Sequence, residues 1–369
     1  MTTKGLFVTH VYDHYGAANS LRLMLERWEG GTFDVLVHRR LMGLGVREKV
    51  RQWCSGRANT IWEDHLPADL CFDGASRDVG YWAIKNLLFR FRRHRILNRM
   101  GQGNYSFIHL NSLALHPLIN SALPFILHVR ELWRTEPQSV LNSINKAKGI
   151  VFIDSATRSR FGDSLTVPNI TLENPVDMTS LKDSKPDRVI LERATGQTVF
   201  SLIARHSPVK GTHFVIETVR KNPAITILLV LAGEWDPLYE KECRSLARGD
   251  SRILFLGDRA DLASLYLATD VVLRAEEYFC VGRTVIEGLF AGCTVLGPWQ
   301  NNDHALLSDE TRWQNRIFRY IPRNGDSLQK MLTLLMKLRT GERSFFTNAG
   351  DYVNRFQRFV TEVSGGPHE

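Results

Sequence analysis

Residues Arg274–Gly297 read RAEEYFCVGRTVIEGLFAGCTVLG, and they contain the parts of one strand–helix–strand unit. Two glutamates, Glu276 and Glu277, lie at the end of a strand-like run and ahead of a turn that contains Gly282. The residues after this turn favour a helix, and the run CTVLG that follows favours a second buried strand. This order of elements is typical of a parallel α/β sheet.

The same alternation extends along the whole chain. Strand-like runs separated by helical periodicity are GLFVTHV, FDVLVH, YSFIHLN, PFILHV and GIVFID in the first half, and TVFSLIA, AITILLVLAG, RILFLG, DVVLRA and CTVLG in the second. Parallel sheets are covered by helices on both faces, so their strands are apolar throughout. The sequence therefore predicts an α/β fold with two Rossmann-like, doubly wound domains in tandem.

Four segments follow from this pattern. We expect an N-terminal domain over residues 1–180, a polar, proline-containing linker over 181–197, and a C-terminal domain over 198–345. Residues 346–369 favour a last amphipathic helix, which we expect to pack back on the N-terminal domain. Ligands of such sheets bind beyond the carboxyl ends of the strands, so we expect the site in a cleft between two facing domains.

The composition is that of a globular protein with anionic partners. The 369 residues carry a net charge of +8, which favours phosphorylated small molecules, anionic lipid surfaces or nucleic acid. The five cysteines form no CxxC pair, so they indicate neither a disulfide scaffold nor a zinc knuckle. The N-terminus lacks signal-peptide features, and no apolar run reaches the ~18–20 residues that span a bilayer. We therefore expect a cytoplasmic protein.

One candidate site lies in the stretch SLIARHSPVKGTHF. A strand ends there near Ala204, and Arg205, Lys210 and Gly211 follow before a helix begins. Two cations and a helix N-terminus at the carboxyl edge of a sheet can bind a phosphate group. The alternative is that the two cations are ordinary solvated side chains of a loop.

A second set of candidates lies in the opening stretch. Gly282, Arg283 and Thr284 would form the loop and first helical turn, where a glycine lets the backbone approach a ligand closely. Glu287 has apolar neighbours, so it would be partly buried and in need of a partner. A carboxylate at this place can accept hydrogen bonds from a vicinal diol such as that of ribose. One of the two preceding glutamates would orient a sugar hydroxyl.

The first half contains weaker candidates. Gly16 and Ala17, in YDHYGAANS, follow the first strand, as in any strand-to-helix loop. His128 ends the strand-like run FILHV, with Arg130 and Glu131 behind it. A single histidine in this position is more often structural than catalytic.

Several kinds of site are not indicated. The stretches GLGVRE and GQGNYS lack the third glycine of a nicotinamide fingerprint, and no Walker motif, HExxH or DxD pair is present. We therefore expect no metal and no other cofactor.

Residues 83–100 read AIKNLLFRFRRHRILNRM and are densely basic. Ile84, Leu87, Leu88 and Phe91 form an apolar stripe at helical spacing. Such a helix could dock on an anionic membrane, which would place the protein peripherally on the inner face, or it could be a surface helix whose arginines snorkel. No recognition motif for nucleic acid accompanies the arginines, so nucleic acid is not expected as a partner.

Taken together, the motifs resemble the retaining glycosyltransferases of family 4 (glycosyl transferases group 1), which have the GT-B fold of two facing Rossmann-like domains. RHSPVKG is similar to the phosphate-binding loop of this family, and GRTVIEGLFAGCTVLG to its donor-site helix and following strand. ENPVD and YGAANSLRLML are similar to the segment before the interdomain connection and to the acceptor-side loop.

The resemblance implies metal-independent transfer of a sugar, with retention, from a nucleotide diphosphate sugar to a glycan or lipid-linked acceptor in bacterial envelope synthesis. It implies catalytic roles for His128, Arg205, Lys210 and Glu277. The donor-binding residues that it implies are Gly16, Ala17, Gly211, Gly233, Gly282, Arg283, Thr284 and Glu287.

The sequence departs from the family pattern at two places. Nine residues separate Glu277 from Glu287, more than in the family, so either Glu276 or Glu277 would be the first donor-site glutamate. Pro175 stands where the family prefers glycine. Two other functions remain open: a sugar-nucleotide 2-epimerase, and a non-catalytic glycosyltransferase-like subunit.

Overall fold

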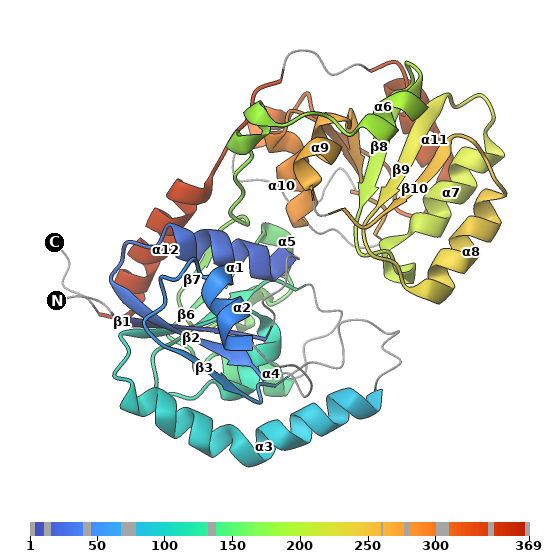
Figure 1. The fold of residues 1–369 in the computed structure, drawn as a ribbon. Helices are drawn as coiled ribbons and strands as arrows, with labels where there is room; N and C mark the ends of the chain where they lie inside the picture. Colours follow the sequence, from blue (N-terminus) through green and yellow to red (C-terminus); the bar gives the residue numbers. More distant parts are fainter. Residues whose placement is uncertain are drawn as a thin grey trace. The chain divides into compact units, whose positions relative to one another are not determined.

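The computed structural model describes residues 4–10, 16–39, 46–67, 79–131, 138–259, 261–276, 281–299, 310–338 and 343–365. The chain forms two compact units, and the chain crosses between them twice. Unit 1 comprises Met1–Pro175 and Asn348–Glu369, and unit 2 comprises Val176–Thr347. Each unit is built on one parallel sheet with helices on both faces, which confirms the prediction of two Rossmann-like, doubly wound α/β domains (Figure 1).

The sheet of unit 1 has seven strands, all parallel to their neighbours. In spatial order they are β3 (Ile61–Asp64), β2 (Thr32–His38), β1 (Lys4–Thr9), β4 (Phe107–Leu110), β5 (Phe125–Val129), β6 (Gly149–Phe152) and β7 (Asn169–Thr171). The direction of winding therefore reverses between β1 and β4.

Two apolar cores cover the two faces of this sheet, because successive side chains of a strand point to opposite faces. Phe7 of β1 packs with α1 (Gly16–Glu26), α2 (Val46–Trp53) and α12 (Ala349–Val363). Leu6 and Val8 pack on the other face with α3 (Val79–Gln102) and α4 (Gln138–Ile144). The C-terminal helix α12 is thus part of the core of unit 1. The short helix α5 (Ser155–Ser159) follows β6.

The sheet of unit 2 has six strands, again all parallel. In spatial order they are β10 (Ile253–Gly257), β9 (Ile227–Ala232), β8 (Thr198–Ile203), β11 (Val271–Leu273), β12 (Thr294–Gly297) and β13 (Ile317–Arg319). One face is covered by α7 (Thr212–Lys221), α8 (Pro237–Ala247) and α11 (Gly325–Leu335). The other is covered by α6 (Arg188–Ala194), α9 (Leu262–Leu267) and α10 (Arg283–Phe290).

The segment 181–197, expected as a linker, is instead folded into unit 2. It contains α6, whose Ile190 and Ala194 lie four residues apart and are buried in the core of that unit. Asp187 caps this helix by accepting hydrogen bonds from the backbone N–H groups of Val189 and Ile190. The polar residues of this segment therefore include the cap of α6 and the side of the helix that faces solvent.

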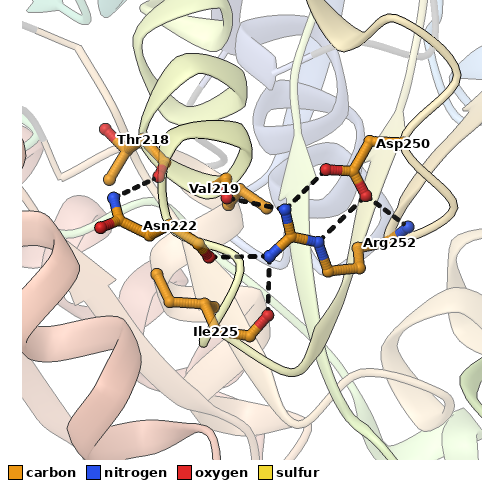
Figure 2. A network of polar contacts seen from close by, with 6 residues as sticks. All are labelled: Thr218, Val219, Asn222, Ile225, Asp250 and Arg252. Carbon is orange, nitrogen blue, oxygen red and sulfur yellow. Dashed lines mark hydrogen bonds and ion pairs between the residues drawn. The ribbon is translucent and has the colours of Figure 1, made fainter.

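Helix α7 is held at its C-terminal end by the side chain of Arg252, just before β10 (Figure 2). The guanidinium donates to the carbonyl oxygens of Val219, Asn222 and Ile225 at 2.8–2.9 Å. It also forms a two-pronged pair with Asp250, which lowers the pKa of that carboxyl. Because helix-end carbonyls lack partners within the helix, this cation fixes the end of α7 relative to the sheet.

Candidate functional site

The strongest candidate site lies at the carboxyl edge of the second sheet, between β8 and β11. These strands are neighbours, and the strand order reverses between them. Segments that leave two such strands diverge and open a crevice, which is where open α/β sheets bind ligands. The segment after β8 contains Lys210, and the segment after β11 contains Arg274 and Glu276.

Gly211 brings these two segments together. Its φ is +66°, and a Cβ placed on it would lie 2.1 Å from the carbonyl oxygen of Ala275. Only glycine permits so close an approach of one backbone to another. The short turn Pro208–Lys210 therefore lies on the backbone that follows β11, and Nζ of Lys210 lies 3.2 Å from Oε1 of Glu276.

Gly233, expected in the donor site, occupies a similar position one strand away. Its φ is +126°, and a Cβ there would lie 2.0 Å from the carbonyl oxygen of Ala204. Gly233 thus lets the end of β9 approach the end of β8.

The buried ring of His206 holds the loop between β8 and α7. Its Nε2 lies 3.1 Å from the carbonyl oxygen of Ala232, and its Nδ1 lies 2.9 Å from the Thr212 hydroxyl. A carbonyl only accepts, so Nε2 carries the proton and Nδ1 accepts from Thr212. The ring also stacks on Trp235. Burial lowers the pKa of His206 to about 4; the hydrogen bond to Ala232 opposes this shift, and the charge of Lys210 adds to it. The ring is therefore neutral at pH 7.

Arg274, which the sequence analysis did not select, lies at the centre of the site. Its side chain is buried, Nε donates to Oε2 of Glu276 at 2.9 Å, and Nη2 donates to Oε1 of the same carboxylate. Nη1 donates to the Thr284 hydroxyl at 2.5 Å. Gly282 lies against the guanidinium, because a Cβ there would be 2.3 Å from Nη1. Arg274 thus joins the end of β11 to the start of α10.

Counted over the described residues alone, the charges in this cluster leave an excess of one cation. Burial by itself raises the pKa of Glu276, but Arg274 and Lys210 outweigh it and lower the pKa to about 2. The carboxylate is therefore ionised at pH 7 and balances one of the two cations. Gly282 has no side chain with which to cap α10, and the dipole of this helix adds positive potential at its first turn. This arrangement suits a phosphate or diphosphate.

Glu287, one turn into α10, has partners within the protein. Its Oε2 accepts from the Tyr266 hydroxyl at 2.7 Å, and its Oε1 accepts from Nε of Arg283 at 2.5 Å. Burial and the charge of Glu287 raise the pKa of Tyr266 well above its ordinary value, so the tyrosine donates. Each carboxylate oxygen retains a second lone pair that a diol could use.

Two expected catalytic residues are not brought into this cluster by the described contacts. Arg205 is 71% exposed and pairs at 3.5 Å with Glu234, which is itself exposed. It precedes the inward-facing His206 and so points outward, as alternation in extended chain requires. Glu277 lies outside the described residues.

In unit 1, His128 is buried in a polar cluster. Its Nδ1 lies 3.3 Å from Nε2 of His109, 3.3 Å from Nη2 of Arg130 and 3.4 Å from the Tyr352 hydroxyl. Burial, with Arg130 and His109 adding to it, lowers the pKa of His128 well below the ordinary value. The imidazole is therefore neutral and has no exposed surface.

The same cluster reaches the start of α1, where Gly16 and Ala17 were expected to bind the donor. Asn111 donates to the Ala17 carbonyl at 3.2 Å and accepts from Nε of Arg130 at 2.8 Å. Gly16 is exposed at the first position of the helix. Arg130 follows His128 by two residues, and side chains two positions apart in an extended segment lie on the same side, so this spacing is a local signal for their contact.

Among the described residues, no group of three His, Cys, Asp or Glu side chains is placed to hold a metal ion. Within the same residues, no helix combines the length and the apolar character needed to cross a bilayer.

No protein-family model matches the sequence, and no curated protein matches it. Solved structures match nearly the whole chain. Anabaena HepE in complex with UDP is similar with a TM-score of 0.66 and 16% identity, over 98% of each chain. A glycosyltransferase from Rickettsia africae is similar with a TM-score of 0.65 and 13% identity, over 98% of this chain and 93% of that one.

S. aureus TarM in complex with UDP is similar with a TM-score of 0.64 and 9% identity, over 98% of this chain and 96% of that one. These likenesses establish the fold. The chain has the two-domain, Rossmann-like architecture that these proteins share, over almost the full length of each.

Replacing Gly211 by alanine should lower the free energy of unfolding by about 3 kcal/mol, because the new Cβ must displace the Ala275 backbone. Gly249→Ala is the matched control, since Gly249 also has a positive φ, +73°, but has open space around it. The control should lose only about 1 kcal/mol. Denaturant titrations measure both losses, and equal losses would contradict the close approach.

The Glu276→Gln variant should lose stability in a pH-dependent manner. The folded-state pKa of Glu276 is depressed, so the ionised carboxylate contributes its full stabilisation above about pH 4.5, and this contribution is lost as the pH falls toward 2. We expect a loss of at most about 3 kcal/mol at pH 7 that shrinks on acidification. Glu217→Gln, in an exposed ion pair with Lys221, should change little at any pH. A loss for Glu276→Gln that does not vary with pH would refute the charge balance.

Proposed function

We propose that the protein transfers a sugar from a nucleotide diphosphate sugar to a glycan or lipid-linked acceptor. The observation that supports this most directly is the cationic cluster at the reversal of strand order in unit 2, where Lys210 and Arg274 pair with one carboxylate and Arg274 also donates to Thr284 in the first turn of α10. The fold adds support, because solved structures that share it include HepE with UDP-glucose and TarM with UDP.

The chemical problem in such a transfer is the negative charge that develops on the departing diphosphate. An ammonium group has three donors, and Glu276 engages only one of those of Lys210, whose side chain is about one third exposed. Lys210 would give its other donors to the diphosphate, together with the first N–H groups of α10. Fixed donors of this kind stabilise charge strongly once water is excluded.

Glu276 and Arg274 would position Lys210 in this mechanism. Glu276 holds the ammonium of Lys210, and Arg274 joins Glu276 to Thr284 in the first turn of α10. Glu287 would hold the ribose through its remaining lone pairs, and Glu276 or Glu277 would contact the sugar. We also propose that the reaction retains the anomeric configuration. It would proceed without a metal ion, because these cations would stabilise the charge on the diphosphate that a metal ion otherwise stabilises.

Unit 1 would provide the acceptor side at the carboxyl edge of its own sheet, near Gly16 and Ala17. His128, a neutral imidazole without exposed surface, would act by holding Arg130 at this edge. We further propose that the protein is a family 4 enzyme of bacterial envelope glycan synthesis, which would act in the cytoplasm or at the inner membrane surface, where a lipid-linked acceptor would be found.

A thermal-shift screen with UDP, GDP, ADP and their sugars tests the donor site. A ligand at 100 times its dissociation constant adds about 2.7 kcal/mol to stability, so the correct nucleotide should stand out. If no nucleotide stabilises the protein, the proposal is wrong. Conversion of a sugar nucleotide to its 2-epimer without acceptor would favour an epimerase, and donor binding without any turnover would favour a non-catalytic subunit.

Lys210→Ala should lower the rate of nucleotide release from the donor by about 10²–10³-fold, because one charge-stabilising donor is removed from the leaving diphosphate. The fold should be retained, since Lys210 lies partly exposed at the end of a turn. Lys221→Ala, at the other end of α7 in an exposed pair, is the matched control and should keep full activity. Full activity in the Lys210 variant would remove this residue from the site.

A further inference from the structure

Helix α3 of unit 1 presents an unusual outer face. It is 24 residues long and runs along the outside of the unit (Figure 1). Its inner face is accounted for, because Phe89, Ile96 and Met100 are buried in the core. On the outer face Ile84 is 53% exposed, Leu87 is 52% exposed and Phe91 is 78% exposed. We name these three residues the apolar ridge.

The three ridge residues follow helical spacing of three and then four, so they lie in one line on the helix surface. A single exposed leucine needs no explanation, but a contiguous exposed apolar strip usually marks a contact surface. This strip is about 10 Å long, given the rise of 1.5 Å per residue.

The same line continues toward the C-terminal end of α3 with a different chemistry. There the surface is hollowed between His94, Arg95, Asn98, Arg99 and Gln102. Arg95 is exposed and has no hydrogen-bond or ion-pair partner among the described residues, and the same holds for Arg90 beside the ridge. The outer face thus combines the apolar ridge with Arg90 beside it and Arg95 beyond it, and we name these two arginines the cationic half.

The remaining arginines of the helix are used within unit 1. Arg92 pairs with Asp64 at 3.0 Å, and Arg93 donates to the Pro117 carbonyl at 2.8 Å. Arg99 lies over the ring of Trp62. The whole helix, Val79–Gln102, contains six Lys or Arg residues and no Asp or Glu. The charge that α3 offers outward is therefore purely positive.

We propose that α3 docks unit 1 on an anionic phospholipid bilayer. The apolar ridge enters the boundary between headgroups and acyl chains, and the cationic half binds phosphate groups of the lipid headgroups. Apolar side chains inserted to this depth and basic side chains close to an anionic leaflet each strengthen such binding. Membrane docking through α3 does not depend on donor binding by unit 2, so the experiment can refute the docking proposal without refuting the proposed function, and the reverse.

A partner of this chemistry matches both halves of the face. A nucleic acid would match the arginines but leave Ile84, Leu87 and Phe91 in water. A neutral apolar partner would match the ridge but leave the charge of Arg90 and Arg95 unopposed. An anionic bilayer offers both, because a helix that lies in the plane of its interface can insert apolar side chains and still reach headgroup phosphates with its arginines.

Flotation of the full-length protein with lipid vesicles tests the proposal. Wild-type protein should bind vesicles of phosphatidylcholine with phosphatidylglycerol at least about tenfold more strongly than vesicles of phosphatidylcholine alone, and salt should weaken this binding. No binding to the anionic vesicles, or equal binding to both kinds, would overturn the proposal.

Two variants separate the two halves of the face. Ile84→Ser with Leu87→Ser and Phe91→Ser should weaken binding to the anionic vesicles by about tenfold or more. Arg90→Gln with Arg95→Gln should abolish the preference for anionic vesicles. All five side chains are exposed, so both variants should melt like the wild type, which thermal unfolding checks.

Matched controls lie in unit 2. Val189→Ser with Leu191→Ser and Leu238→Ser removes three exposed apolar side chains elsewhere, and Arg188→Gln with Lys221→Gln removes two exposed cations. Both should bind vesicles like the wild type. If the controls lose as much binding as the α3 variants, or if sedimentation shows that the ridge is buried in a dimer which the serine variant dissolves, the proposal is wrong.

Discussion

The candidate site depends on one steric constraint, the contact between the backbone at Gly211 and that at Ala275. Strands β8 and β11 are neighbours in the sheet, but their following segments belong to opposite sides of the fold. Glycine at position 211 lets the first segment lie directly on the second. The neutral, buried His206 holds that loop from the other side through Thr212 and Ala232. Packing consequently places Lys210 beside Glu276, and Arg274 links Glu276 to the first turn of α10.

The charge balance of the site follows from this placement of Lys210. Lys210 and Arg274 would repel each other, and Glu276 between them makes their proximity tolerable. The carboxylate does not cancel both charges, and the dipole of α10 contributes further positive potential at the start of the helix. The site is thus ordered before a ligand arrives and retains its attraction for an anion. Preorganised charge of this kind needs little rearrangement during a reaction.

Local sequence patterns predicted both sheets and part of the candidate site. They did not predict the features that depend on contacts between residues far apart in the sequence. Apolar strand-like runs predicted both sheets, because parallel strands buried on both faces are apolar throughout. Lys210, Gly211 and Thr284 could be named as candidates from the sequence because the carboxyl ends of the strands share an edge. Arg274 was missed, since its buried pairing with Glu276 and Thr284 has no local signature. The polar ends of 181–197 concealed the buried face of α6, which only unit 2 completes.

The structure of the protein bound to UDP, or to the nucleoside diphosphate that the thermal-shift screen selects, tests the central claim most directly. We predict that the diphosphate oxygens lie within hydrogen-bond distance of Nζ of Lys210 and of the backbone N–H groups of Gly282–Thr284. A diphosphate bound away from the ends of β8 and β11, with Lys210 engaged only by Glu276, would contradict it.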